Sequence, residues 1–296
     1  MAAWKKFSAP PGENFISAAS DGGDQIYLTT FQGNNTELYR YTISTDSWVA
    51  LTGLSMWNNG YNVLQHYNGK LYNFKGYDAS NPTGIYIYDI LSNTWAPRID
   101  HPAGTMRDIY GSERIGNKIY VGLMSIDQTR QKIFEYNADL NTGRAVLDIS
   151  SSERVAALCQ HNGNNLYYLE LPSRLIYKLN LDTLQRTVIT TVPATNSSEL
   201  YLASVLGFLV VFPRPIELSD SPIYFDGTSW KSLNMPYGFV TGYAFENMGN
   251  GFLLASPETS GGGGTTTVNN ASFSSPGLTT SPFRYPTRWM EIANAT

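Results

Sequence analysis

The chain has 296 residues but only one cysteine, Cys159, so no disulfide can form within it. This scarcity bears only weakly on the compartment, because large secreted domains also fold without disulfides. No run of apolar residues approaches 18 in length, which argues against a membrane-spanning helix. The N-terminal sequence MAAWKKFSAPPGENF lacks the apolar core of an export signal. We therefore expect neither a membrane span nor signal-directed export.

Charged residues are also scarce, at 15 % of the chain, and the formal net charge is −4. Lysine and arginine form no basic cluster; the densest basic spots are Lys5–Lys6 and the pair Arg284 and Arg288. A protein that binds nucleic acid normally presents a basic face to the phosphates. The composition therefore argues against nucleic acid as a partner.

Signals for metal, cofactor or catalytic chemistry are weak. The three histidines, His66, His101 and His161, lack the spacing of metal ligands. The four glycines at 261–264 are not followed by the lysine and helix of a phosphate-binding loop. Cys159 and His161 would share one face of a strand, as in a catalytic pair, but such a cysteine is more often a buried, inert thiol. We predict no metal, no cofactor and no catalytic residue.

Tyrosine is abundant, with 20 copies, and so are the turn-forming residues Asn, Ser, Thr and Gly. This composition is typical of an all-β protein with polar loops. Six glycines recur 42–47 residues apart, each in a tight-turn sequence before an apolar run: Gly22, Gly69, Gly116, Gly163, Gly207 and Gly249. A glycine in this context indicates a hairpin that requires a positive φ angle. Recurrence at about 40–50 residues indicates a stacked or radial repeat.

The sequence between successive glycines follows one pattern. A short β-rich run, such as residues 26–28, is followed by a polar loop and a second alternating run, such as residues 38–41. A turn then leads to a fourth run, which opens on Trp48, Trp95, Trp230 or Trp289. One more apolar run precedes each glycine, which gives four strands per unit. Four-stranded units that repeat around an axis form a β-propeller.

Residues 88–95, YDILSNTW, resemble the kelch repeat, in which a Tyr-Asp pair precedes a tryptophan at this spacing. Tyr41 to Trp48 repeats the spacing, and Tyr136 to Gly143 keeps it without the tryptophan. The paired glycines that the family carries after the second strand are absent. The resemblance implies an all-β fold: a six-bladed kelch-like β-propeller with four antiparallel strands per blade, formed as one domain by residues 1–296.

Two segments near the chain ends bear on how the ring closes. The run at Trp4 is similar to the run at Trp289, so the N-terminal segment either closes the ring beside the C-terminal strands or adds an edge strand. Residues 257–281 form an insertion in the last unit, with the Gly/Thr/Ser-rich composition of a flexible linker. We expect the tryptophans that open the fourth runs to pack between blades.

Positions eight and nine before each repeated glycine would begin the innermost strands, at one mouth of a central channel. Six of these twelve positions have side chains suited to ligand contact, here called the channel-mouth residues: Glu13, Tyr61, Arg107, Asp108, Arg154 and Glu199. A mixed-charge ring in a charge-poor chain suggests a site for a polar ligand, a sugar or a partner loop. The alternative is that these are ordinary loop ends, where charges in water cost little. Long loops at 75–83, 124–131, 212–221 and 257–281 would open on the same face, which we expect to be the interaction surface.

Three functions fit this sequence. The first is a non-catalytic interaction or structural propeller in a large assembly, such as the tail or adsorption apparatus of a phage particle. It is favoured by the amino-acid composition, which is poor in charge and rich in Asn, Thr, Ser, Gly and Tyr, and by the lack of a recognisable appended domain. The second is carbohydrate binding through Tyr- and Trp-rich loops. The third is a sugar-processing enzyme, of the epimerase or lyase type, in which the charged channel-mouth residues supply acid, base and electrostatic groups. The first function implies protein partners and a location in a virion or the cytoplasm.

Overall fold

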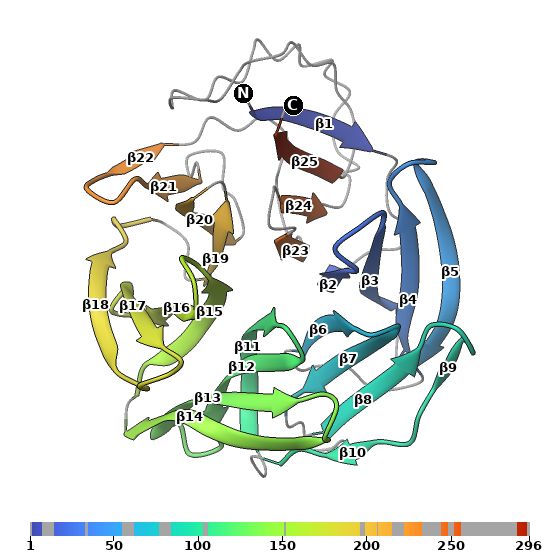
Figure 1. Ribbon diagram of the computed structural model, residues 1–296, viewed down its shortest axis with the longest axis horizontal. Coiled ribbons are helices and arrows are strands. Elements are labelled where there is room, and N and C mark those ends of the chain that lie inside the picture. The colour runs from blue at the N-terminus through green and yellow to red at the C-terminus, as the bar shows by residue number, and fades with distance from the viewer. Residues whose placement is uncertain are drawn as a thin grey trace.

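The chain folds into small β-sheets arranged in a ring around a common centre, as the computed structural model shows in Figure 1. The structure describes residues 2–7, 15–32, 35–54, 62–76, 84–102, 106–150, 152–195, 199–205, 207–214, 222–232, 244–247, 252–255 and 289–294. Across these ranges every regular element is a strand. A search of them for a helix long and apolar enough to cross a bilayer finds none.

Five of the sheets, or blades, have four strands each. One contains β2 (Phe15–Ser20), β3 (Gln25–Gln32), β4 (Asn35–Thr42) and β5 (Ser47–Leu54). Another contains β11 (Met106–Ile115), β12 (Lys118–Ser125), β13 (Arg130–Asn137) and β14 (Thr142–Ser150). A third contains β15 (Arg154–Gln160), β16 (Asn165–Leu171), β17 (Leu175–Asn180) and β18 (Arg186–Thr191). A fourth contains β19 (Glu199–Val205), β20 (Phe208–Arg214), β21 (Ile223–Phe225) and β22 (Trp230–Ser232). The fifth contains β23 (Ala244–Asn247), β24 (Phe252–Ala255), β25 (Trp289–Asn294) and β1 (Ala2–Phe7).

A further sheet departs from the four-stranded pattern, so the expectation of six four-stranded blades is wrong in this respect. It contains β6 (Asn62–Tyr67), β7 (Lys70–Lys75), β8 (Gly84–Asp89), β9 (Thr94–Trp95) and β10 (Ile99–Asp100). Both β9 and β10 pair with β8, so together they occupy the place of a single outer strand. Pro97 lies between them, and proline has no backbone N–H to continue the ladder.

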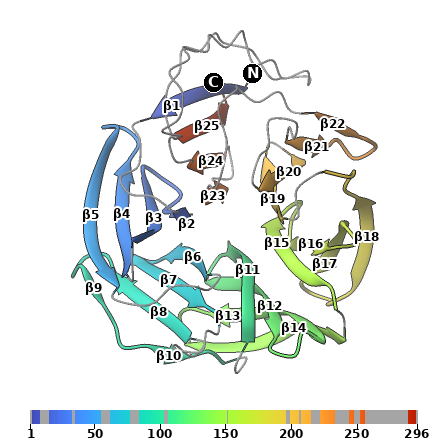
Figure 2. The same ribbon diagram turned by 180° about the vertical axis from the view of Figure 1, so that it is seen from behind.

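The two ends of the chain meet in one blade, which closes the ring. β1 is the outer strand of this blade and pairs antiparallel with β25 from Ala2–Asn294 to Phe7–Trp289. Figures 1 and 2 show the two termini beside each other from opposite sides. Trp289 was expected to open an outer strand, but its strand is the third of four, and Trp4 lies on the outer one. The insertion at 257–281 lies outside the described residues.

The repeated glycines that the structure describes lie in the hairpins between the first and second strands of their blades. Gly22, Gly69, Gly116, Gly163 and Gly207 have φ angles between 62° and 84°. Gly249 lies outside the described residues. Residues other than glycine are strained at such angles, so these positions fix the hairpins and, through them, the strand register.

Apolar side chains fill the space between neighbouring blades. One core cluster joins Tyr72 and Phe74 of β7 to Ile119 and Val121 of β12, and another joins residues of β15–β17 to residues of β19 and β20. Hydrogen bonds also link successive innermost strands at the repeat spacing. The Leu64 N–H donates to Ser17 Oγ (2.9 Å), and Gln65 Nε2 donates to Ser112 Oγ (2.9 Å); both pairs are 47 residues apart. The sequence period therefore corresponds to one blade.

A tyrosine fixes the turn before the outer strand in three blades. Tyr41, Tyr88 and Tyr136 are fully buried, and each hydroxyl donates to a side-chain oxygen five residues later, on Asp46, Asn93 and Asn141. These three acceptors have φ angles of 48°, 56° and 53°. Asn and Asp tolerate this left-handed backbone better than other non-glycine residues. The same residue therefore accepts the tyrosine hydrogen bond and adopts the positive φ angle that the turn requires.

Substitution of Asn93 is expected to separate the contribution of its hydrogen bonds from that of its positive φ angle. Asn93→Ala removes the acceptor for Tyr88 and for the Thr52 N–H, which donates to Asn93 Oδ1 (3.1 Å), and it leaves alanine in a left-handed backbone. We expect a loss of about 2–3 kcal/mol in the free energy of unfolding, measured by urea denaturation. Asn93→Gly keeps the backbone free of strain, so it should recover about 1 kcal/mol of that loss. Equal losses in the two variants would contradict the backbone contribution.

Candidate functional site

The channel-mouth residues that the structure describes lie at the beginnings of innermost strands. Arg154 begins β15 and Glu199 begins β19, while Arg107 and Asp108 are the second and third residues of β11. Of these four, only Arg154 has a described side chain. Glu13 and Tyr61 lie outside the described residues.

β11 and β15 lie side by side and run in the same direction. The Arg154 guanidinium lies 4.6 Å from the centre of the Tyr110 ring. Further along, a Cβ at Gly111 would lie only 2.9 Å from Cα of Ala157, so glycine permits the close approach of the strands. Because the contacts advance together, the backbone of Arg107 and Asp108 lies toward the same end of the ring as Arg154.

The Arg154 guanidinium lies over an aromatic ring of the neighbouring blade. Its guanidinium contacts Tyr110 of the preceding blade, and both side chains are half-buried. A cation over an aromatic face gains about 0.5–1 kcal/mol at an exposed site and more where water is excluded. The arrangement fixes a positive charge beside a tyrosine, which suits a polar or anionic group of a partner.

A buried carboxylate, Glu170 of β16, joins the same two blades; its neighbour in the chain, Leu171, pairs with Arg154. Gln131 Nε2 donates to Glu170 Oε1 (2.6 Å), and Arg186 Nη1 donates to the same oxygen (3.3 Å). Gln131 and Glu170 are almost completely buried. Arg186 also lies 4.9 Å from the centre of the Tyr177 ring. Removing one member of such a network would leave a buried group unpaired, so these contacts stiffen the interface between the blades.

Burial and a second carboxylate shift the titration of Glu170. Burial is the largest cause that raises the pKa of Glu170; hydrogen bonds from Gln131 and attraction to Arg186 oppose it, and the neighbouring Glu153 raises it further. Glu153 lies just before β15, and its Oε2 accepts a hydrogen bond from the Ser173 hydroxyl. Glu170 is thus a carboxyl group that protonates more easily than usual, but its contacts are with the protein itself.

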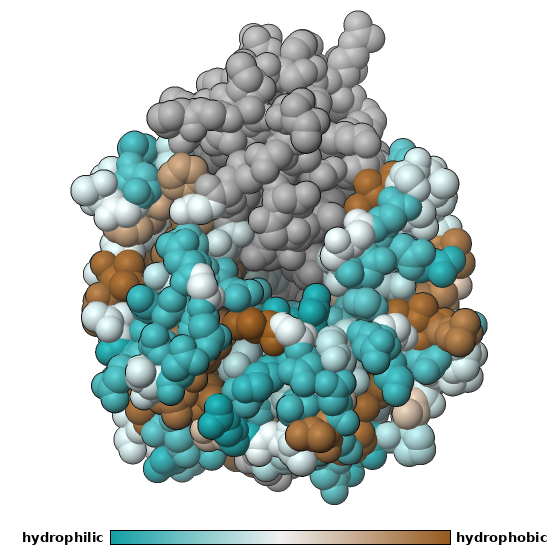
Figure 3. All heavy atoms as spheres, in the orientation of Figure 1, coloured by the Kyte–Doolittle hydropathy of each residue, from teal (hydrophilic) through white to brown (hydrophobic). Residues whose placement is uncertain are grey.

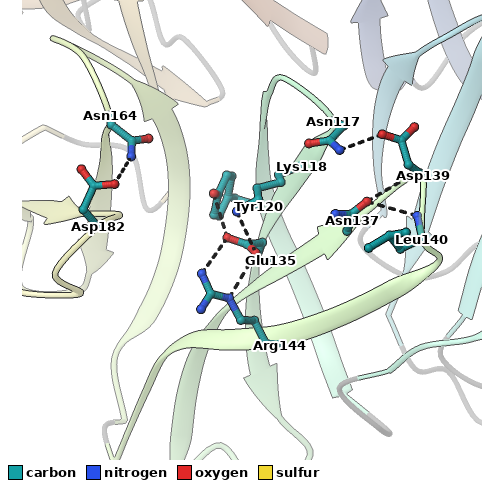
Figure 4. Close-up of polar contacts among 10 residues, drawn as sticks. All are labelled: Asn117, Lys118, Tyr120, Glu135, Asn137, Asp139, Leu140, Arg144, Asn164 and Asp182. Carbon is teal, nitrogen blue, oxygen red and sulfur yellow. Dashed lines mark hydrogen bonds and ion pairs between the residues drawn. The ribbon is translucent and has the colours of Figure 1, made fainter.

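A second polar cluster surrounds Glu135 on the same blade interface (Figure 4). Tyr120, Glu135 and Arg144 face one another across β12, β13 and β14. The Tyr120 hydroxyl donates to Glu135 Oε2 (2.9 Å), Arg144 Nε donates to Oε1 (3.1 Å), and Lys118 Nζ lies 3.2 Å from Oε1. Burial acts to raise the pKa of Glu135, but hydrogen bonds from Arg144, Tyr120 and Lys118 outweigh it and lower the pKa.

Sequence reasoning missed Gln131, Glu135 and Glu170. The available signal was their spacing. Gln131, Ile133 and Glu135 are two residues apart along one strand, so their side chains lie on the same face, and Ile133 is fully buried against the neighbouring blade. A fourth missed residue is Glu113 of β11, where burial raises the pKa to about 8 despite a hydrogen bond from the backbone of Gln160. A polar residue at a core-facing strand position therefore marks each of these groups.

The outer-strand tryptophans contact neighbouring structure in related ways. Trp95 Nε1 donates to the Thr52 carbonyl oxygen of β5 (2.8 Å), and Trp230 Nε1 donates to Thr190 Oγ1 of β18 (3.2 Å). Each bond runs from the outer strand of one blade to the outer strand of the preceding blade. The Trp48 ring lies 4.7 Å from the Tyr41 ring of the adjacent strand.

Cys159 and His161, which precede Gly163, have different surroundings. Cys159 is fully buried, and burial raises the pKa of its thiol well above the usual range. His161 Nδ1 instead lies 2.7 Å from Ser204 Oγ of the next blade. Among the described residues, no group of three or more His, Cys, Asp or Glu side chains is placed to hold a metal ion.

The predicted loop at 124–131 is shorter than expected. β12 extends to Ser125 and β13 begins at Arg130, so only residues 126–129 connect them. The remainder of the expected loop is strand, in which Gln131 reaches Glu170. The other expected loops, at 75–83 and 212–221, lie largely outside the described residues.

Comparison with known proteins supports the fold alone. No family model and no curated protein matches the sequence. The structure of YjhT is similar to this one, with a TM-score of 0.62 and 12 % identity over 86 % of this chain and 94 % of YjhT. A nidogen/laminin complex contains a chain with a TM-score of 0.60 and 12 % identity, over 81 % of this chain and 87 % of that one. The protein is therefore an all-β propeller built of small antiparallel blades, most of them four-stranded.

Proposed function

We propose that this protein is a six-bladed, kelch-like propeller that serves as a non-catalytic docking component of a large assembly such as a phage particle. One observation carries the proposal: the Arg154 guanidinium lies over the Tyr110 ring at the end of the ring of blades where the innermost strands β11 and β15 begin. A preorganised charge on a rigid scaffold suits recognition of a partner, because little side-chain freedom is lost on binding.

The carboxylates beside this position support docking rather than catalysis. Glu170 is buried with Gln131 and Arg186, and Glu153 is hydrogen-bonded to Ser173. A general acid or base must reach the substrate's proton, and these carboxylates are directed to partners within the protein. The charge-poor composition, rich in Tyr, Asn, Ser, Thr and Gly, is compatible with an assembly component.

Carbohydrate binding is a second candidate, and Tyr110 is the observation that favours it. Aromatic rings with a few polar groups line ligand pockets, and this half-buried ring lies beside the charged group of Arg154, which covers one face. A sugar-processing enzyme would require an accessible acid or base at the same end of the ring.

An incorporation experiment tests the docking proposal. Particles are assembled in cells that carry either the wild-type chain or Arg107→Ala/Arg154→Ala, and the copies per particle are counted by quantitative mass spectrometry. We expect the variant to be reduced at least fivefold. Lys70→Ala, which removes an exposed cation just after the hairpin glycine Gly69, is the matched control and should incorporate normally.

Each alternative has its own outcome. Normal incorporation of the double variant would show that the partner docks elsewhere. Absence of the wild-type chain from particles, together with binding on a glycan array that Tyr110→Ala abolishes, would favour carbohydrate recognition. Turnover of an acidic sugar by the purified chain would favour the enzyme.

A further inference from the structure

One end of the ring, here called the turn face, carries the hairpins between first and second strands and the turns between third and fourth strands. Each hairpin follows an innermost strand, so this end is opposite to the end at which β11 and β15 begin. Within three blades a backbone N–H of the turn donates to a carbonyl oxygen of the hairpin: Ile90 to Gly69 (3.1 Å), Ala138 to Asn117 (2.9 Å) and Leu181 to Asn164 (3.1 Å). Between blades, the Tyr67 hydroxyl of one hairpin donates to Asp139 Oδ1 of the next turn (3.0 Å). Hairpins and turns of neighbouring blades therefore adjoin on the turn face.

Three leucines are exposed on the turn face, in three successive blades. Leu91 is 97 % exposed between β8 and β9, Leu140 is 68 % exposed between β13 and β14, and Leu184 is 39 % exposed between β17 and β18. Single apolar residues are common on protein surfaces, and Figure 3 shows small hydrophobic patches scattered among hydrophilic ones. The three leucines differ from such scattered residues because they recur in the same turn of neighbouring blades.

The turns do not depend on these leucines. The polar residue that begins each turn accepts a backbone N–H from within it at 2.8–3.1 Å: Asp89, Asn137 and Asn180. Leu184 even opposes the turn, because its φ angle is 57° and a leucine is strained there. In the two preceding blades Asn93 and Asn141, which tolerate this backbone better, have the left-handed position. The leucines therefore contribute to the surface rather than to the turns, and strain of this kind often marks a functional position.

The segments that connect strands on the turn face are acidic. In the part of the chain that the structure describes, they are residues 21–24, 43–46, 68–69, 90–93, 116–117, 138–141, 161–164, 181–185, 207 and 226–229. These described segments contain six aspartates and neither lysine nor arginine: Asp21, Asp24, Asp46, Asp139, Asp182 and Asp226. Figure 4 shows Asp139 and Leu140 together on one turn and Asp182 on the next blade. The opposite end carries both signs of charge, as Asp127 and Arg174 show.

The cations nearest to these segments lie on the adjoining strand ends and have partners in the protein. Lys118 Nζ lies 3.2 Å from Glu135 Oε1, and Arg114 Nη1 donates to the Gly116 carbonyl oxygen (3.1 Å). Lys70 is paired in register with Asp89 of the neighbouring strand. The turn face thus combines exposed leucines with negative charge.

We propose that the turn face is a docking surface for a basic segment of a protein partner. Apolar side chains of the segment contact Leu91, Leu140 and Leu184, and its lysines or arginines contact the turn aspartates. Charge complementarity selects this occupant, because a second copy of this chain has no basic face to offer and nucleic acid would bring like charge. The surface lies at the end of the ring opposite Arg154, so it does not depend on the docking function proposed above.

A peptide of six Lys-Leu repeats, labelled with a fluorophore, serves as the probe. Its binding to the full purified chain is followed by fluorescence anisotropy. Leu140→Ser should raise the dissociation constant about threefold or more, and Leu91→Ser/Leu140→Ser about tenfold or more, because apolar contact area is lost. Ile126→Ser is the matched control: Ile126 is 48 % exposed in the same blade as Leu140 but at the opposite end, so the constant should not change.

The charge contribution has its own pair of variants. Asp182→Asn keeps an acceptor for Asn164 Nδ2, which donates to Asp182 Oδ1 (2.7 Å), but removes the charge, so it should weaken binding about twofold or more at low salt. Asp127→Asn, at the opposite end, should have no effect. A peptide of Glu-Leu repeats should not bind, and a peptide of Lys-Ser repeats should bind about tenfold more weakly than the Lys-Leu peptide.

The variant Arg107→Ala/Arg154→Ala should bind the Lys-Leu peptide as wild type does, which separates this surface from the opposite end of the ring. Failure of the Lys-Leu peptide to bind the wild-type chain would overturn the proposal. So would equal weakening by Ile126→Ser and Leu140→Ser, or equal binding of the Glu-Leu peptide. Self-association of the wild-type chain in sedimentation velocity that Leu91→Ser/Leu140→Ser abolishes would also overturn it, because the occupant would then be a second copy.

Discussion

Replacing Gly143 by tryptophan is expected to destabilise the protein by at least about 2–3 kcal/mol, although the variant restores the kelch-like repeat. Three other outer strands carry Trp48, Trp95 or Trp230 at the equivalent place. At Gly143, however, a Cβ would lie 2.2 Å from Cε1 of Phe134 and 2.9 Å from the Glu135 carbonyl oxygen. Phe134 is 3 % exposed and packs in the core, so its ring has little room to move.

Urea denaturation of two further variants distinguishes steric conflict from a general intolerance of tryptophan. Thr142→Trp alters the adjacent, exposed residue of the same strand and should change the free energy of unfolding by no more than about 0.5 kcal/mol. Phe134→Ala/Gly143→Trp should be more stable than the sum of the single variants predicts, because the indole can enter the space that the phenyl ring leaves. A Gly143→Trp chain as stable as wild type would show that Phe134 can rotate away.

The order of strands and turns within a blade was predictable because the residues that determine it are close together in the sequence. A glycine with a positive φ angle, an alternating run and a tight turn act within a few residues, so the sequence shows them directly. The tyrosine before the outer strand belongs to the same class. Tyr88 and Asn93 are five residues apart, and their hydrogen bond could have been predicted from the recurring Tyr and Asx spacing.

The place of Trp289 was not predictable in this way. Its strand is flanked by β24 on one side and by β1, from the opposite end of the chain, on the other. Alternation and spacing are alike for a third and a fourth strand, so the position depends on which distant segment pairs beside it. The interrupted outer strand, β9 and β10, was predictable in part. Pro97 is a local signal for the interruption, but the sequence does not show that the segments before and after it both pair with β8.

The polar network of the candidate site depends on contacts between blades. Gln131 and Glu170 are 39 residues apart and meet only because β13 and β16 belong to neighbouring blades. Arg154 reaches Tyr110 across 44 residues for the same reason. The channel-mouth hypothesis identified Arg154 by its position in the repeat, but the partners that hold it follow from the angle and spacing between blades.

His101 is expected to make the protein lose stability as the pH falls from 6.5 toward 4. It lies after β10, between two blades, with its ring centre 6.0 Å from that of Phe74 and 5.2 Å from that of Phe134. Its side chain is 5 % exposed, and burial lowers the pKa from its ordinary value of 6.5 to about 4. In this interval the unfolded chain binds a proton that the folded chain does not, so protonation favours unfolding.

The size of this effect follows from the shift in pKa, at 1.36 kcal/mol per unit. Between pH 7.5 and 4.5, His101 should lower the free energy of unfolding by about 2–3 kcal/mol. His101→Phe keeps an aromatic ring between Phe74 and Phe134 but cannot take up a proton. Relative to wild type, the loss of stability over this pH interval should therefore be smaller in the variant by about the same amount.

Chemical denaturation at the two pH values measures this difference. His66 and His161 also have lowered pKa values, caused mainly by burial, but they contribute equally in both chains and cancel in the comparison. Phe74→Leu is the matched control: it alters packing against His101 without removing the titrating group, so it should be less stable at both pH values yet keep most of the pH dependence. If His101→Phe and wild type lose the same stability on acidification, His101 is already accessible to protons in the folded state.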